Sequence, residues 1–211
     1  MIWKDYSKLK GLHAFCGASN YHWRNYTIEK LIRTKFNSYS ASIGTHLHDY
    51  AAKHINYRMK LKKTGKDDAL FYLVDKSIPR DVVDMDRIYP TLMNYVNDAI
   101  GFRMSPEVVL YYSDNFYGTC DAISWNNKCL RIHDLKTGEN PGSFLQLENY
   151  AAFFCLDYKV KPTEIDKIEF RIYQNGDIVE ANPEPKILVP IIDQIIEFNK
   201  ALINFRSETI S

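Results

Sequence analysis

The sequence has few cysteines and no long apolar run, and each absence excludes a class of protein. The four cysteines, Cys16, Cys120, Cys129 and Cys155, include no Cys-x-x-Cys pair, so we expect reduced thiols and no zinc site. No stretch of about 18 apolar residues is present, and no charged-then-apolar segment resembles a signal peptide. We therefore expect a cytoplasmic protein with no membrane partner.

A strong net charge is also lacking, because the 211 residues carry a formal charge of only +1. The chain therefore gives no global basic signal for nucleic acid. A protein that gathers carboxylates around metal ions cancels part of its own Lys and Arg excess, so DNA binding is not excluded. A hydrophobic content of 45% and a charged content of 25% are ordinary for a globular protein. With no repeat, low-complexity tract or linker, we expect one domain over residues 1–211.

Residues 1–105 are predicted to be mainly helical. Apolar residues recur at three- and four-residue spacing over 20–34, 40–61 and 84–102, the last with Pro90 either kinking the helix or resetting its start. The polar stretch 62–68 is predicted to be a loop.

In residues 106–211 the pattern changes to that of short strands. Segments 108–112, 118–125 and 128–136 are separated by turn-forming residues and predict an antiparallel meander. A helix should follow up to Leu156, with Asn140-Pro141 as its N-cap and first-turn proline. Strands over 167–173 and 178–181, joined at Asn175-Gly176, and a helix over 185–205 complete the chain. This order predicts an α/β fold with a mixed sheet flanked by helices.

The hairpin around Asn126-Asn127 brings charged residues together. With these two residues as the loop, Asp121 lies opposite Ile132, and Asp134 shares the same sheet face. Asp121 and Asp134 are then diagonal neighbours, with Cα atoms roughly 7–8 Å apart, and Lys136 takes the next position on that face.

Two carboxylates and an ammonium group on one face suit phosphodiester hydrolysis. Carboxylate oxygens hold Mg²⁺, which activates a bound water, and an ammonium group can stabilise charge on phosphorus. The alternative is a surface hairpin with an Asp–Lys salt bridge that contributes little. The apolar Ile123 and Ile132 on the same face favour the first interpretation, because they place the charges at the edge of a core.

These residues belong to an ordered set of motifs that resembles a known family. Gly118-x-x-Asp121, a strand ending in Asp134-Leu135-Lys136, and Gln146-x-x-x-Tyr150 on the following helix are similar to the RecB-like branch of the PD-(D/E)xK nucleases. Upstream, Gly44-x-x-x-His48 resembles the family's GxxxH motif. The segment 13–26 resembles the opening of phage-encoded exonucleases, from which it departs at Cys16-Gly17-Ala18. The resemblance covers nearly the whole chain.

The resemblance implies a restriction-endonuclease-like core and a metal site. It implies that His48, Asp121 and Asp134 bind Mg²⁺, for which Mn²⁺ can substitute, and that Leu135 adds its backbone carbonyl. It also implies that Lys136 is the catalytic lysine. Neighbouring His46 cannot face the same site, because residues i and i+2 on a helix point about 200° apart.

Gln146, Tyr150 and Glu107 each have two interpretations. The resemblance implies that Gln146 and Tyr150, stacked on one helix face, lie beside the substrate. Ser143-x-x-Gln146 also fits a capping box, which would occupy the Gln146 side chain, and Tyr150 could equally be core. Glu107 is either a solvated charge or an acidic group near the metal.

The aromatic segments 21–26 and 111–112 could stack nucleobases, although most of these rings are expected in the core. Some RecB-like nucleases carry an iron–sulfur cluster held by one cysteine before the histidine motif and three near the C-terminus. Here Cys155 is the last cysteine, so we expect no cluster.

The sequence thus favours a metal-dependent DNA nuclease similar to phage exonucleases and acting in the host cytoplasm. The alternatives are a structure-selective endonuclease and a catalytically silent DNA-binding accessory protein. The resemblance also suggests a homo-oligomer and a recombination or single-strand-binding partner.

Overall fold

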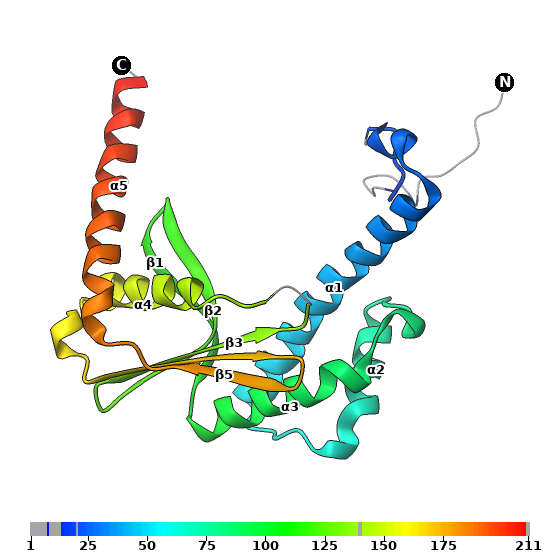
Figure 1. Ribbon diagram of the computed structural model, residues 1–211, viewed down its shortest axis with the longest axis horizontal. Helices are drawn as coiled ribbons and strands as arrows, with labels where there is room; N and C mark the ends of the chain where they lie inside the picture. The colour runs from blue at the N-terminus through cyan, green and yellow to red at the C-terminus, as the bar shows by residue number, and fades with distance from the viewer. Residues whose placement is uncertain (1–7, 9–13, 20, 139–140, 210–211) are drawn as a thin grey trace.

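A five-stranded mixed sheet forms the centre of the protein (Figure 1). The computed structural model describes residue 8 and residues 14–19, 21–138 and 141–209. The strands follow the order β1-β2-β3-β4-β5, antiparallel except for the β3–β4 pair, which is parallel. Their bounds are β1 (Ser105–Ser113), β2 (Phe116–Asn126), β3 (Cys129–Lys136), β4 (Lys167–Gln174) and β5 (Asp177–Ala181). The predicted α/β fold with a mixed sheet is confirmed.

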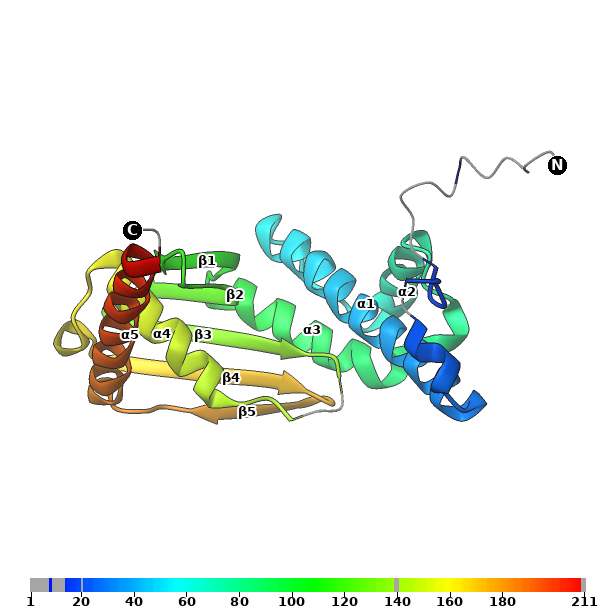
Figure 2. The same ribbon diagram turned by 90° about the horizontal axis from the view of Figure 1, so that it is seen from above.

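Helices cover both faces of the sheet (Figure 2). They are α1 (Ile28–Asn56), α2 (Lys66–Asp75), α3 (Met85–Gly101), α4 (Phe144–Tyr158) and α5 (Leu188–Thr209), with a short 3-10 helix, η2 (Tyr21–Asn25), before α1. One core packs α1, α2 and α3 against Ala122, Leu135 and Tyr173 of the sheet. The other packs α4 against the opposite face, including Leu130 and Ile132 of β3. Helix α4 is the crossover between the parallel strands β3 and β4.

The β2–β3 hairpin turns one residue later than the sequence prediction. Asn126 pairs with Cys129, so the loop is Asn127-Lys128 rather than Asn126-Asn127. Both loop residues have positive φ, 49° and 57°, as a type I′ turn requires. The pairs Ile123–Ile132 and Ala122–His133 extend to place Asp121 directly opposite Asp134 instead of Ile132. The predicted partner was wrong, because the turn lies one residue later and every partner therefore moves by two residues.

The β1–β2 hairpin bends away from the rest of the sheet (Figure 1), and its ladder is interrupted at Glu107 and Asp121. Among the described residues these two opposite positions are skipped by the ladder, although Pro106–Ala122 and Val108–Cys120 pair on either side. Glu107 has a φ of 51°, in the left-handed region that non-glycine residues rarely occupy. Side-chain alternation changes here, since Cys120 and Ile123 both belong to the α4 core while Ala122 packs against α1 and α3.

Three of the helix and loop predictions need correction, whereas the helix predicted over 84–102 is present as α3 (Met85–Gly101). Residues 20–34 and 40–61 do not form two helices: α1 is continuous from Ile28 to Asn56, since no Gly or Pro interrupts residues 35–39. The predicted loop 62–68 is wrong in its second half, because α2 begins at Lys66, with two aspartates in its first turn that suit the helix dipole. Helix α3 starts at Met85 and retains Pro90 inside it. Helix α4 begins at Phe144, so Pro141 does not open it; Asn20 and Asn140 lie outside the described residues.

Over the part of the chain that the structure describes, no helix combines the length and the apolar character needed to traverse a bilayer.

Candidate metal centre and hydrolytic site

Helix α1 crosses the end of β3, and a glycine permits this close approach. A Cβ added at Gly44 would lie 3.1 Å from Oγ1 of Thr137, just beyond the end of β3. His48 follows one helical turn later and therefore lies over the same edge of the sheet. The Gly44-x-x-x-His48 spacing thus has a physical reason. With Thr45, Asp49 and Glu107, these two residues line an open cleft of about 540 Å³.

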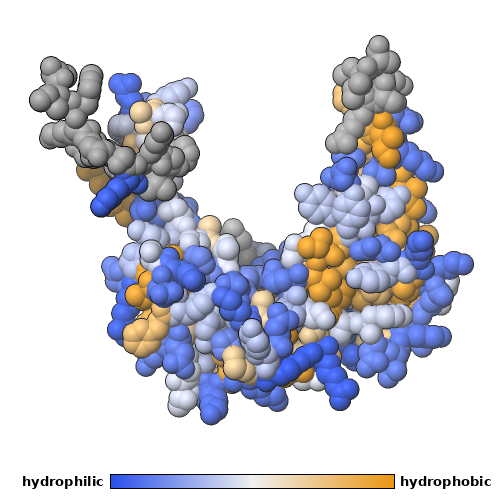
Figure 3. All heavy atoms as spheres, turned by 180° about the vertical axis from the view of Figure 1, so that it is seen from behind, coloured by the Kyte–Doolittle hydropathy of each residue, from blue (hydrophilic) through white to orange (hydrophobic). Residues whose placement is uncertain are grey.

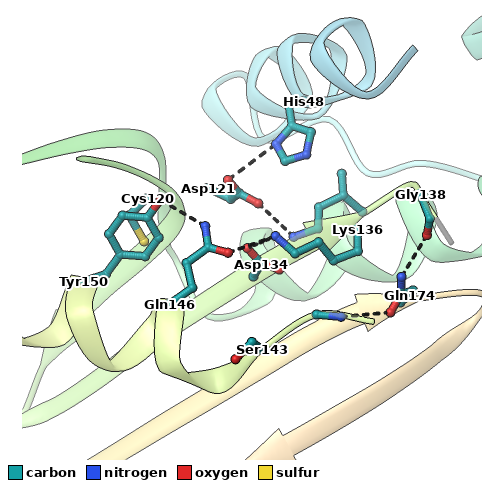
Figure 4. Close-up of polar contacts among 12 residues, drawn as sticks. His48, Cys120, Asp121, Asp134, Lys136, Gly138, Ser143, Gln146, Tyr150 and Gln174 are labelled. Atoms are coloured by element: carbon teal, nitrogen blue, oxygen red, sulfur yellow. Dashed lines mark hydrogen bonds and ion pairs between the residues drawn. The ribbon is translucent and has the colours of Figure 1, made fainter. Parts of the chain in front are cut away.

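His48 lies beside two carboxylates, that of Asp121 (Figure 4) and that of Glu107. Its Nδ1 lies 3.5 Å from Oδ1 of Asp121 and 3.7 Å from Oε1 of Glu107. One ligand atom from each residue lies within 4.8 Å of the other two, a spacing that a single cation can bridge. Of the two interpretations of Glu107, the structure therefore favours the one that places it at the site.

The two carboxylates also control the charge of the imidazole. Burial disfavours the protonated form, but the contacts with Asp121 and Glu107 outweigh burial and raise the pKa of His48 to about 10. Without a metal ion, His48 is therefore a cation at neutral pH. A metal that binds the imidazole must displace this proton.

Asp121 is held by the backbone of β3. Its Oδ2 accepts a hydrogen bond of 2.8 Å from the Leu135 N–H, in the place where the antiparallel ladder would otherwise continue. In an extended strand the N–H and C=O of one residue point to the same side. The Leu135 carbonyl therefore also faces β2, as its predicted role as a ligand requires, while its side chain is buried in the α1–α3 core.

Asp134 is buried, and its carboxylate is only half satisfied. Its Oδ1 accepts a hydrogen bond of 2.9 Å from Lys136 Nζ, whereas Oδ2 has no hydrogen-bond partner among the described residues. The side chain is only 3% exposed. Burial and the charge of Asp121 raise the pKa of Asp134, and the nearby Lys136 only partly offsets them. A buried carboxylate oxygen without a partner is costly, so this position favours a cation.

Gln146 and Tyr150 continue the polar network from Lys136 onto α4. Lys136 Nζ donates to Gln146 Oε1 at 3.1 Å, and Gln146 Nε2 donates to the Tyr150 hydroxyl at 3.2 Å. Ser143 is the N-cap of α4, but its hydroxyl accepts from the Leu145 N–H. The Gln146 side chain is therefore directed to the site and not used in a capping box. Tyr150 is half-buried and contributes both to the core and to this network.

Gly118 makes room for Tyr150. An added Cβ at Gly118 would lie 2.9 Å from Cε1 of the Tyr150 ring, so the two motifs Gly118-x-x-Asp121 and Gln146-x-x-x-Tyr150 meet in space.

We expect Gly118→Ala to lower the free energy of unfolding by about 1–3 kcal/mol, because the new methyl group must displace a packed ring. Gly101→Ala is the matched control, since an added Cβ there meets nothing within 4 Å, and it should change stability little. Urea denaturation of both variants measures the difference. Equal midpoints for Gly118→Ala and the wild type would contradict the close contact.

The sequence analysis did not identify two residues, Gln174 and Arg87, whose side chains bind the backbone next to the site. Gln174, opposite Lys136 in the parallel register, accepts from the Gly142 N–H at 3.2 Å and donates to the Gly138 carbonyl at 2.8 Å. It thereby holds the segment that leads from β3 to α4 (Figure 4). Arg87 of α3 donates to the Thr137 carbonyl at 3.3 Å. These contacts join segments that are far apart in the sequence, so local sequence patterns do not reveal them.

The donor set fits a hard divalent cation. Carboxylate oxygens from two or three residues, one imidazole and a strand carbonyl are the ligand types that Mg²⁺ and Mn²⁺ accept. The partnerless Oδ2 of Asp134 and the cluster of His48, Glu107 and Asp121 are the two observations that support this fit. Asp134 lies outside that cluster and is hydrogen-bonded to Lys136.

The structure thus brings all the sequence-predicted site residues into one region, supplied by α1, β1, β2, β3 and α4. The aromatic segments divide: Tyr21 and Tyr111 are exposed, whereas Trp23, Tyr26 and Tyr112 are half-buried. Comparison with known proteins adds nothing to this geometry, since no family model matches the chain and no curated protein is significantly similar to it.

Proposed function

We propose that the protein is a metal-dependent DNA nuclease that hydrolyses phosphodiester bonds, with exonuclease action favoured by the resemblance to phage exonucleases. The observation that carries the proposal is the buried Asp134, with one oxygen on Lys136 and the other without a partner, next to the ligand cluster of His48, Glu107 and Asp121. A purely structural salt bridge gives no reason to bury an unsatisfied carboxylate oxygen.

Each side chain has a distinct task in this proposal. His48, Asp121 and Asp134 hold the cation, with Glu107 and the Leu135 carbonyl as further oxygen donors. When bound, Mg²⁺ supplies a nucleophilic water of lowered pKa and neutralises charge on the phosphate. Lys136 places its ammonium group beside the reacting phosphate, where it stabilises the added negative charge. Gln146 orients Lys136, and Tyr150 orients Gln146.

Removal of the metal tests the proposal directly. End-labelled linear duplex and single-stranded DNA are incubated with the protein in Mg²⁺, Mn²⁺, Ca²⁺ or excess EDTA, and the products are resolved over time. We expect cleavage in Mg²⁺ and Mn²⁺, binding without turnover in Ca²⁺, and no cleavage in EDTA. Full activity in EDTA would exclude the mechanism.

The same assay separates the alternatives. Survival of circular DNA while linear DNA is degraded indicates an exonuclease, and cutting of the circle indicates an endonuclease. DNA binding without cleavage under every condition would instead support an accessory role. From the resemblance alone we further propose that the protein acts in the cytoplasm of a host cell.

A further inference from the structure

One face of the β1–β2 hairpin carries a strip of exposed side chains that ends at the candidate site. Tyr111 pairs with Tyr117 across the hairpin, and Val109 pairs with Thr119. Tyr111 is 48% exposed, Tyr117 is 60% exposed and Val109 is 55% exposed. The next positions of the same parity are Glu107 and Asp121, so the strip leads from the tyrosine pair to the ligand cluster.

The other face of the hairpin is packed against α4. Leu110 and Cys120 are fully buried in the α4 core, and Gly118 lies against the Tyr150 ring. The hairpin thus has one face committed to the core and one face open. The space-filling view shows the molecule hollowed between the arm formed by α1 and the side that carries the hairpin and α5 (Figure 3).

Tyr111, one ring of the tyrosine pair, is held in place by two hydrogen bonds. The Tyr111 hydroxyl donates to Oδ1 of Asp114 at 2.8 Å, and the Tyr111 N–H donates to Oδ2 of Asp157 at 2.9 Å. The two ring centroids lie 6.2 Å apart, with 32° between the ring planes. Exposed rings that are fixed before a ligand arrives lose little entropy when a flat partner binds them.

We propose that this strip binds the unpaired nucleotides of a single DNA strand, whose bases stack on Tyr111 and Tyr117 while a phosphate reaches the metal centre. The inference rests on the proposed nuclease function and names its substrate as a single-stranded end. Aromatic side chains along a strand path stack bases of any sequence, and only unpaired bases expose a face to them. The tyrosine pair lies four residues from Glu107 and Asp121, about 13 Å along the strands, a span of a few nucleotides.

The strip leads directly to the ligand cluster, and this continuity favours a DNA strand as its ligand. Between the tyrosines and the ligand cluster the strip contains only Val109 and Thr119, which carry no charge that would repel phosphates. An apolar strip for a protein partner would have no reason to end among metal-ligating side chains. DNA that enters the site must approach it along a neighbouring surface, and the strip presents exposed stacking side chains in line with the ligand cluster.

Binding without turnover tests the proposal. Affinity for a fluorescein-labelled oligothymidine is measured by anisotropy in Ca²⁺. The double variant Tyr111→Ala/Tyr117→Ala should bind at least about tenfold more weakly, whereas Tyr111→Phe/Tyr117→Phe should stay within about twofold of the wild type. Tyr57→Ala is the matched control, since Tyr57 is 74% exposed at the C-terminal end of α1, and it should bind normally. Unchanged affinity in the double alanine variant would overturn the proposal.

A second readout separates this inference from the nuclease function. In Mg²⁺, bis(p-nitrophenyl) phosphate is too short to span the strip, so the double alanine variant should hydrolyse it at the wild-type rate. Loss of that activity in the variant would show damage at the metal centre and overturn the stacking role. If the wild type cleaves nothing, the nuclease proposal fails. The anisotropy measurement still tests whether the strip binds single-stranded DNA. An equal loss of affinity for blunt duplex and for single strands would overturn the single-strand assignment.

Discussion

Asp134→Asn should abolish cleavage and at the same time stabilise the metal-free protein. Turnover should fall by at least about 10²-fold, because the substitution removes a charged metal ligand whose ion contributes several kcal/mol to transition-state stabilisation. Affinity for DNA should be kept or raised, since one negative charge near the phosphate is lost. Single-turnover cleavage and DNA binding in Ca²⁺ measure the two effects.

The raised pKa of Asp134 determines whether Asp134→Asn raises or lowers the stability of the metal-free protein. A carboxyl group whose pKa is higher in the folded state than in the unfolded chain lowers stability wherever it is ionised. Asp134→Asn should therefore raise the Tm in EDTA at pH 7 to 8. This gain should shrink as the pH falls through the raised folded-state pKa toward the ordinary range of an aspartate.

Asp177→Asn provides the control for this pair of measurements, since Asp177 is an exposed aspartate at the start of β5. It should change neither cleavage nor Tm in this way. Wild-type turnover in Asp134→Asn would remove Asp134 from the mechanism. A parallel loss of stability, DNA binding and cleavage would instead indicate misfolding.

Lys136→Arg should lower turnover by roughly 10²-fold while metal binding persists. Lys136 fits a compact ammonium group between Asp134 Oδ1 and Gln146 Oε1, at 2.9 and 3.1 Å. A planar guanidinium keeps the charge but cannot place it at the same point between these two acceptors. Cleavage is measured in Mg²⁺, and metal binding is measured as the rise in Tm on addition of Mn²⁺.

Lys167→Arg is the matched substitution, because Lys167 is 54% exposed at the start of β4 and likewise contacts a carboxylate, that of Glu169. It should leave both measurements unchanged. If Lys136→Arg cleaves DNA at the wild-type rate, any positive charge at this position is sufficient. The assignment of Lys136 as a specific catalytic lysine would then be wrong. Loss of the Mn²⁺-dependent rise in Tm would mean that Lys136 supports the metal site itself.

The hairpin shows why the site could be predicted from sequence although its register was wrong. The turn formed at Asn127-Lys128, where two residues adopt positive φ, and the sequence offered Asn126-Asn127 as an equally good pair of turn formers. A two-residue turn that moves by one position changes partners but preserves which residues share a face. That parity predicted the grouping of Asp121, Asp134 and Lys136, although in the structure side-chain alternation changes at Asp121 and its carboxylate accepts from the Leu135 N–H.

Other features depended on contacts that no local pattern contains. The charged start of α2 was predicted as loop because polar composition resembles that of a turn, whereas in the structure Ala69 and Leu73 bury one side of this helix in the α1–α3 core. The bend at Glu107 and Asp121 could not be predicted from local sequence. Its role is to bring both carboxylates to His48 of α1, and this contact joins segments that are far apart in the chain. Gln174 could be assigned a role only after β4 was known to pair in parallel with β3.

The bend in β1 also bears on strand-to-strand aggregation at this edge of the sheet. A strand at the edge of a sheet offers unpaired backbone groups to any passing strand, which is the usual start of aggregation. β1 interrupts that row three times: Pro106 has no N–H, Glu107 leaves the extended conformation, and the Tyr111 N–H is occupied by Asp157. Few consecutive backbone groups along this edge could therefore template a neighbour. The distortion that brings Glu107 to His48 also makes the edge a poor template for fibril growth.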